Sequence, residues 1–223
     1  GSSNSLKVIV LGSEGWLWIN NQYITKLSLT DRTDPGNIAL AGGFYQNDVK
    51  DGYRWENVTI KSIESVQLET SGSIPFNDTG RTESVLWDDV NISNLIFEVS
   101  IENPDETSTI GVGIRDNYAQ LSAIQITSKE SRWIHYFYLD KWEEIDTDIS
   151  SVIKSSMGET NQIKIIADEN IGALFINNVF VTSLDFTRNL GRGGVRIYGE
   201  MSGIRSNHRE TNYHSTKLWH LGE

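Results

Sequence analysis

The segment Leu95-Ile-Phe-Glu-Val-Ser-Ile-Glu102 places an apolar side chain at every second position. Leu95, Phe97, Val99 and Ile101 therefore share one face, and Ile96, Glu98, Ser100 and Glu102 lie on the other. Successive side chains of a β-strand point to opposite faces of the sheet. The period of two predicts a strand whose first face is buried in a core.

The same period recurs along the chain, in segments 110–114, 124–126 and 163–165. Many short strands separated by turn signals favour a β-sandwich or a β-barrel. One segment differs, because Ile149, Val152 and Ile153 have helical spacing within Asp148–Ser156. We predict a short helix there, with Asp148 as its N-terminal cap.

Composition narrows the function classes. The 223 residues carry a formal net charge of -11, which opposes binding to nucleic acid or anionic lipid. No apolar run approaches the roughly 18 residues of a membrane helix, and the first residues do not resemble a signal peptide. With no cysteine, the chain has no disulfides, cysteine nucleophiles or thiolate metal ligands.

An internal repeat organises the chain. Shifting the sequence by 157 residues aligns Asn4–Phe44 with Asn161–Met201 without a gap. The identical residues of the first copy are Asn4, Lys7, Ile9, Gly15, Leu17, Ile19, Asn20, Asn21, Thr25, Leu27, Thr30, Gly36 and Gly42. The pairs Asn20-Asn21 and Asn177-Asn178 are predicted to occupy equivalent hairpin turns, because asparagine tolerates a positive φ.

Only the second copy has further strands before it in this sequence, in residues 65–157. We therefore expect two domains: residues 1–64 as the second half of a jelly-roll repeat, and residues 65–223 as a complete domain. The half domain presents Leu6, Val8, Leu17, Ile19, Leu27, Leu29, Ile38 and Leu40 on one apolar face. Exposing such a face is costly, so we expect a homodimer through residues 1–64, or a cover supplied by the second domain, whose exterior is expected to be polar.

The order of the segments resembles the concanavalin A-like (laminin G-like) jelly-roll domains of bacterial surface proteins. The resemblance rests on Leu95–Glu102, Ile110-Gly-Val-Gly-Ile-Arg-Asp116, a segment around Trp142, Asn161–Ile166, Leu174-Phe-Ile-Asn-Asn178, Gly193–Ile197 and Leu218–Leu221. It implies an all-β jelly-roll sandwich and an extracellular or cell-surface location. That fold hosts lectins, sugar-binding modules, glucanases and adhesion domains, so function has to be argued from a site.

A sugar site needs aromatic faces with hydrogen-bonding groups beside them. If Trp133, Phe137 and Leu139 point inward, Tyr136 and Tyr138 point outward. Gly111 and Gly113 would then open a groove lined by four residues: Arg115, Gln125, Tyr136 and Tyr138. The alternative is that the tyrosines are ordinary surface aromatics of a sheet. Trp16, Trp18 and Trp55 form a second candidate patch.

Glucanases of the resembling fold carry Glu-x-Asp-x-(x)-Glu on a strand, with one carboxylate as nucleophile and one as acid/base. Glu144-Ile-Asp146-Thr-Asp148 is similar, but Asp148 stands where the pattern has Glu. The segment is also expected to be a connection before the short helix. We therefore expect no catalytic residues and interpret the segment as an acidic turn.

Metal sites are weakly indicated. His208, Glu210 and His214 lie in a long polar segment without a third fixed ligand for zinc. Asp88-Asp89, Asp105-Glu106 and Asp146-Thr-Asp148 offer the oxygen ligands that calcium prefers, and related domains often carry one structural Ca²⁺. The sequence therefore predicts no certain cofactor, with calcium the favoured metal.

Taken together, these features favour a non-catalytic module for carbohydrate binding or adhesion, from a surface protein with tandem repeats, whose partner is a carbohydrate or a cell-surface glycan. A structural or assembly module that makes protein contacts is the alternative, and a glycoside hydrolase using Glu144 and Asp146 is the third.

Overall fold

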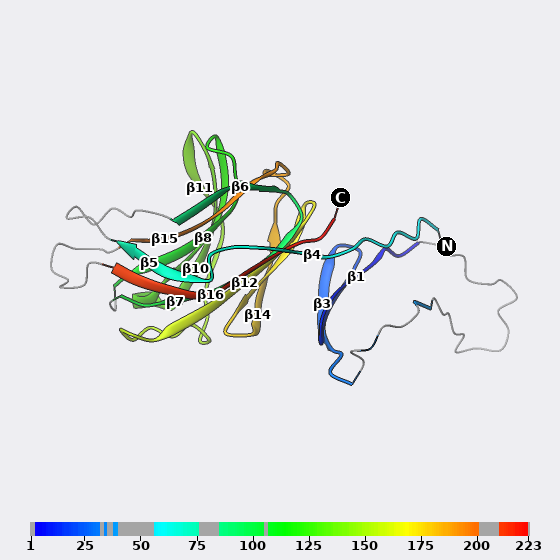
Figure 1. The fold of residues 1–223 in the computed structure, drawn as a ribbon, viewed down its shortest axis with the longest axis horizontal. Helices are drawn as coiled ribbons and strands as arrows, with labels where there is room; N and C mark the ends of the chain where they lie inside the picture. Colours follow the sequence, from blue (N-terminus) through cyan, green and yellow to red (C-terminus); the bar gives the residue numbers. More distant parts are fainter. Residues whose placement is uncertain are drawn as a thin grey trace, which may run out of the picture. The chain divides into compact units, whose positions relative to one another are not determined.

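A computed structural model describes residues 3–31, 34, 38–39, 56–75, 85–104, 107–200 and 210–222. The chain divides into two compact units, residues 1–62 and 63–223. Each unit has its own sheets and is described by itself below (Figure 1). The expected boundary, between residues 64 and 65, lies two residues from this division.

The first unit contains one antiparallel sheet in the order β1-β2-β3. Its strands are β1 (Leu6–Leu11), β2 (Glu14–Ile19) and β3 (Gln22–Ser28). Strands β2 and β3 are joined by the Asn20-Asn21 turn, in which both residues have a positive φ, of 51° and 65°. Asparagine adopts this region more readily than other residues with a Cβ, and the turn needs it to match the strand twist.

The second unit is a jelly-roll β-sandwich. Its elements are β4 (Glu64–Val66), β5 (Ser71–Pro75), β6 (Val85–Ile92), β7 (Leu95–Glu102), β8 (Thr109–Asp116), β9 (Gln120–Thr127), the 3-10 turn η1 (Ser128–Glu130), β10 (Arg132–Leu139), β11 (Lys141–Ile149), β12 (Thr160–Asp168), β13 (Ile171–Ile176), β14 (Val179–Asp185), β15 (Gly193–Glu200) and β16 (Glu210–His220). One sheet has six strands in the order β11-β10-β9-β8-β15-β6. The other has seven, in the order β14-β13-β12-β7-β16-β4, with β5 also paired to β16.

The core of the second unit lies between these two sheets. Its cluster of buried residues includes Val112, Ile124 and Trp133 from the six-stranded sheet, and Phe97 and Ile165 from the seven-stranded sheet. The alternation in Leu95–Glu102 therefore predicted the inner face of β7 correctly. Within the described residues, no helix is long and apolar enough to cross a membrane.

The repeat is visible in the strand pairing. Strands β1 and β2 pair from Leu6↔Ile19 to Leu11↔Glu14, and β12 and β13 pair from Ile163↔Ile176 to Asp168↔Ile171, which is the same register after a shift of 157. The next pair of strands also matches, including a register shift at equivalent places, Leu17/Trp18 and Leu174/Phe175. The prediction that the two Asn-Asn pairs occupy equivalent hairpin turns is confirmed.

Equivalent side chains also make equivalent contacts. Asn20 Oδ1 accepts from the Ser5 amide at 2.9 Å, and Asn177 Oδ1 accepts from the Gln162 amide at 2.9 Å. Trp18 and Tyr23 meet edge to face with ring centroids 5.5 Å apart. Phe175 and Phe180, at the equivalent positions, do so at 5.6 Å. Gly36, Gly42 and Leu40 of the repeat lie outside the described residues.

Two sequence-based expectations are wrong. Asp148–Ser156 is not a helix: β11 runs to Ile149 and turns follow it, because the Lys141–Ile149 segment pairs with β10. The exterior face of β7 and β12 is not a solvated polar surface either. Glu98, Ser100 and Lys164 are buried there, and Glu98 Oε2 lies 3.1 Å from Lys164 Nζ.

His135 is an ionisable group on the inner face of the six-stranded sheet. It lies on β10 between the inward-pointing Trp133 and Phe137, and its ring meets Phe186 edge to face at 5.4 Å. Burial lowers the pKa of His135 from 6.5 to about 4, against an opposing effect of the Asp185 charge. The folded protein therefore keeps this imidazole neutral at mildly acidic pH.

This pKa predicts a pH-dependent stability. Between about pH 6.5 and pH 4 the unfolded chain binds a proton at His135 and the folded chain does not, so the free energy of unfolding falls as the pH falls. The loss should total on the order of 3 kcal/mol. Urea unfolding of the wild type and of His135→Leu across this range measures it. Equal pH dependence in both proteins would contradict the assignment.

Candidate functional site

Three aromatic side chains gather on the solvent face of the six-stranded sheet. Tyr136 and Tyr138 are two residues apart on β10, and Trp142 of β11 lies directly opposite Tyr138 in the register. The Trp142 ring lies 5.0 Å from that of Tyr138 and meets the Tyr136 ring edge to face at 5.8 Å. Trp142 is 50% exposed. We call Tyr136, Tyr138 and Trp142 the aromatic triad.

The outward direction of Tyr136 and Tyr138 follows from alternation, since Trp133 and Phe137 are buried on the inner face. Leu139, at the end of the strand, is 45% exposed and does not join them. Trp142 was missed as a site residue by the sequence analysis. The sequence signal for it is Asp140, because aspartate favours tight turns and tolerates a positive φ. In the structure Asp140 has a φ of 63°, and the turn returns the chain beside Tyr138.

Gln125 lies on the same face as the triad. It is half-buried, and the register places it between Gly111 on β8 and Ile134 on β10. The neighbouring row runs from Gly113 through Ala123 to Tyr136. Within the described part of the chain, the Gln125 amide has no hydrogen-bond partner, so it can bind a ligand.

The two glycines do not open a groove as expected. A Cβ on Gly111 would lie 2.4 Å from Cζ of Tyr198, and a Cβ on Gly113 would lie 2.5 Å from Cδ1 of Leu121. Tyr198 and Leu121 thus lie over the glycines, and with Ala123 they form a small apolar cluster against which Tyr136 and Tyr138 pack. The glycines support a closely packed platform beneath the triad.

Arg115 does not lie on this face, which corrects the expected groove. Its φ is 54° and the register of β8 with β15 shifts beside it, so the bulge turns its side chain inward. Arg115 is fully buried and donates to the carbonyl oxygens of Ser93 and Glu169 at 2.7 Å and to that of Asn189. Burial lowers its pKa to about 10, which leaves it charged at neutral pH.

Phe186 also contacts Arg115: the guanidinium carbon lies over the Phe186 ring, 5.0 Å from its centre. The guanidinium therefore ties three connecting segments to the sandwich core. Its role is structural, and alternation alone could not show this because the bulge reverses the direction of the side chain.

Next to the bulge, the solvent face carries a charged pair. Arg196, opposite Gly113 on β15, donates from Nε to Oδ2 of Asp116 at 2.7 Å. Tyr118 is exposed and donates to Oδ2 of Asp88 at 2.7 Å, and this hydrogen bond raises the pKa of Tyr118. The charges of this region are thus satisfied within the protein.

The acidic segment is part of strand β11, and a bulge divides its carboxylates. Glu144 is opposite Tyr136, and Asp146 is opposite His135, with the register shifting between these pairs. Because paired residues point to the same face, Glu144 lies on the solvent face with the triad and Asp146 on the opposite one. Alternation in a regular strand would have placed both on one face, and the bulge separates them. The connection and acidic turn expected for this segment are wrong, because it pairs with β10 as a strand.

Metal ligation finds no support in the described residues, which contain no group of three or more His, Asp or Glu side chains able to hold an ion. Asp105 and Glu106 lie outside the described residues, so calcium stays a prediction there. His208, of the weakly indicated zinc cluster, also lies outside them. Of the second aromatic patch, Trp16 and Trp18 are buried, and Trp55 lies outside the described residues.

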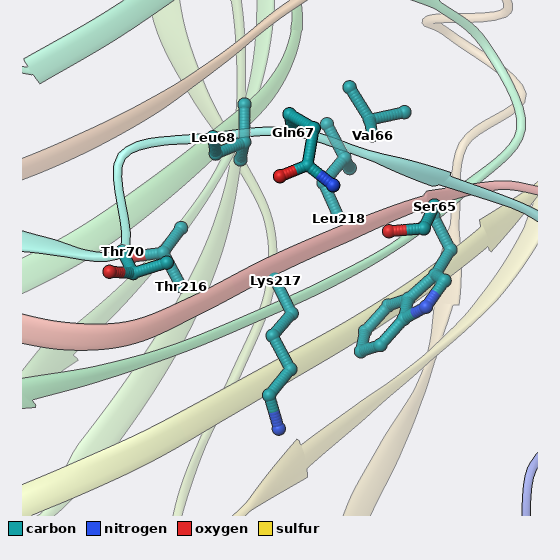
Figure 2. Close-up of a pocket in the computed structure, with 9 residues that line it drawn as sticks. Ser65, Val66, Gln67, Leu68, Thr70, Thr216, Lys217 and Leu218 are labelled. Atoms are coloured by element: carbon teal, nitrogen blue, oxygen red, sulfur yellow. The ribbon is translucent and has the colours of Figure 1, made fainter.

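A separate hollow of about 210 Å³ lies at β16, where the chain leaves β4 for β5 (Figure 2). Ser65, Gln67, Thr70 and Lys217 line it, and Lys217 extends away from the Val66–Leu68 segment. Oγ1 of Thr216 is buried there and has no hydrogen-bond partner among the described residues. An ordered water in the hollow would satisfy this hydroxyl, so we assign no ligand to it.

Sequence comparison with protein families and with curated proteins finds no match. Solved structures share the fold at low identity. A native glycosidic hydrolase superposes with a TM-score of 0.51 at 7% identity, over 72% of this chain and 82% of the hydrolase.

Two lectin-like structures are also similar. Sheep galectin-11 in complex with glycerol gives a TM-score of 0.44 at 9% identity, over 73% of this chain and 99% of the galectin. A carbohydrate-binding module from Bacillus subtilis gives 0.40 at 7% identity, over 73% and 90% of the two chains. The similarity to the hydrolase, at 7% identity, shows the fold alone, and function has to be argued from the site.

Proposed function

We propose that the second unit is a non-catalytic carbohydrate-binding module whose ligand stacks on the aromatic triad. The observation that carries the proposal is the exposed Trp142 ring held against Tyr136 and Tyr138 on the solvent face of the sheet. Aromatic faces bind the C–H surfaces of sugar rings, and polar groups beside them fix the hydroxyls. Gln125 is the polar group we assign to this role.

The charge of the protein favours a neutral glycan. The chain carries a net charge of -11, and Glu144 lies on the same face as the triad. Both features repel acidic sugars. We further propose, from the sequence resemblance, that the chain is of the laminin G-like kind and serves adhesion to a cell-surface glycan on the outside of a bacterium, within a protein of tandem repeats.

Replacing side chains of the aromatic triad should weaken the affinity for the glycan. Tyr136→Ala with Tyr138→Ala, and separately Trp142→Ala, should each weaken affinity about tenfold for any neutral glycan that a glycan array identifies, since a lost stacking ring costs on the order of 1 kcal/mol or more. Phe180→Ala, which removes a partly exposed aromatic from β14, is the matched control. Unchanged affinity in folded triad variants would contradict this site.

A glycoside hydrolase using Glu144 and Asp146 is the third function that the sequence left open. Retaining enzymes need two carboxyl groups about 5 Å apart facing the same bond. The bulge in β11 places Glu144 and Asp146 on opposite faces, and this supports a module without hydrolytic activity.

Hydrolysis can be tested on the same ligands. We expect no release of reducing ends from a bound glycan by the wild-type protein over many hours, with Glu144→Gln behaving identically. Release by the wild type that disappears in Glu144→Gln would establish the hydrolase instead.

Assembly through residues 1–64 is a second function that we propose. Leu6, Val8 and Val10 are 52%, 53% and 48% exposed on one face of β1. Their equivalents, Ile163, Ile165 and Ala167, are fully buried in the sandwich core. Covering the exposed half of each β1 side chain would stabilise a complex by about 1 kcal/mol per residue. Two such faces are self-complementary, so the simplest complex is a homodimer.

The dimer predicts a concentration-dependent mass. Light scattering should show the 25.1 kDa chain approaching twice its mass as concentration rises, and Val8→Asp should remain a monomer. Ser28→Asp is the control, because it adds the same charge to the other face of this sheet, at the position equivalent to Asp185. A monomeric wild type at all concentrations, or a dimer unaffected by Val8→Asp, would reject the homodimer.

A further inference from the structure

Two asparagines of the second unit hold the loop that precedes β12. Asn161 Nδ2 donates to the carbonyl oxygen of Lys154 at 2.8 Å, and its Oδ1 accepts from the Lys154 amide at 2.9 Å. Asn177 Nδ2 donates to the carbonyl oxygen of Val152 at 2.7 Å and to Asn161 Oδ1 at 3.0 Å. The pair thus binds the backbone of residues 152–154.

The first unit has the same pair in the same geometry. Asn4 and Asn20 are the equivalent residues, and Asn20 Nδ2 donates to Asn4 Oδ1 at 2.9 Å. Both side chains are exposed. Among the described residues, the remaining amide hydrogens of Asn4 and Asn20 have no acceptor equivalent to the carbonyl oxygens of Val152 and Lys154.

The apolar face of the first unit also has an equivalent in the second unit. Seven positions of the first copy have equivalents in the core of the second unit: Leu6, Val8, Val10, Leu17, Ile19, Leu27 and Leu29 correspond to Ile163, Ile165, Ala167, Leu174, Ile176, Leu184 and Phe186. In the second unit these residues are covered by Val112, Ile124 and Trp133 of the six-stranded sheet. The strands that carry Val112, Ile124 and Trp133 and the 152–154 loop all belong to residues 63–157.

We propose that residues 3–31 form an acceptor for a polypeptide half-repeat with the chemistry of residues 63–157. This rests on the assembly function proposed above and names its partner. The occupant covers Leu6, Val8 and Val10 with a sheet face like that of Val112, Ile124 and Trp133. It also presents a loop whose backbone binds Asn4 and Asn20, as residues 152–154 bind Asn161 and Asn177.

A second copy of the first unit is the weaker occupant. It supplies an apolar face, but the strands β1 to β3 include no loop equivalent to residues 152–154 for Asn4 and Asn20. The homodimer is therefore the state of an acceptor without its half-repeat, and the half-repeat displaces the second copy.

The test supplies the half-repeat from the protein's own sequence. A copy of residues 63–159 is joined directly to Ser3 of the full chain, which reproduces the connection from Glu159 to Thr160 without a linker. Amide hydrogen exchange of Val8, Val10 and Leu17 should slow at least tenfold relative to the unextended chain. Their rates should approach those of Ile165, Ala167 and Leu174, which serve as the internal standard. Light scattering should show the extended chain as a monomer.

The variant Asn4→Ala distinguishes binding of the half-repeat to the asparagine pair from apolar contact alone. Asn4 precedes β1 and is exposed, so its replacement should change exchange in the unextended chain less than twofold. In the extended chain the replacement should speed amide exchange in β1 and β2 several-fold, so that part of the gained protection is lost. Gln22→Ala, another exposed polar residue of the sheet, is the control and should leave the gain intact.

The outcomes are distinct. Unchanged exchange in β1 and β2 of the extended chain overturns the half-repeat proposal, whether the added segment folds elsewhere or stays unprotected. If the extended chain also remains a dimer, the homodimer stands without it. A monomeric unextended chain whose β1 and β2 become protected by the extension rejects the homodimer and supports the half-repeat.

Discussion

The inner faces of the six-stranded and seven-stranded sheets stabilise each other, because each consists of aliphatic and aromatic side chains that only the other sheet removes from water. Val112, Ile124 and Trp133 are as dependent on Phe97 and Ile165 as the reverse. This mutual burial fixes which side of β10 faces the core and which side faces solvent. Tyr136 and Tyr138 therefore point outward, because Trp133 and Phe137 on the same strand are buried in the core. Trp142 points the same way because it pairs with Tyr138.

Bulges then decide which side chains leave that regular alternation. One at Arg115 turns a guanidinium inward to bind three carbonyl oxygens, and one in β11 separates Glu144 from Asp146. A regular β8 would have placed a cation on the solvent face, and a regular β11 would have placed paired carboxylates there. On this aromatic surface the Gln125 amide has no hydrogen-bond partner among the described residues, which supports the proposed binding of a neutral ligand.

The sequence predicted the regular features well, since alternation and asparagine turns are local. The strand at Leu95–Glu102, the outward Tyr136 and Tyr138, and the Asn20 and Asn177 hairpins all followed from residue type and spacing. Arg115 was misplaced because its positive φ is imposed by tertiary contacts and not by a glycine or asparagine. The helix expected at Asp148–Ser156 failed for a related reason: pairing with β10 outweighs the helical spacing of three residues.

The two copies of the repeat differ in the exposure of one apolar sheet face, which is exposed at β1 and buried at β12. Seven positions of the inner face, from Leu6 to Leu29 in the first copy, are apolar in both copies. Contiguous exposed apolar patches usually mark interaction sites. In the first unit, aliphatic side chains occupy the positions that face the six-stranded sheet in the second unit. The first unit also has the asparagine pair Asn4 and Asn20, whose equivalents in the second unit bind the loop of residues 152–154. Both features support the proposal that β1 to β3 receive a partner which completes a sandwich.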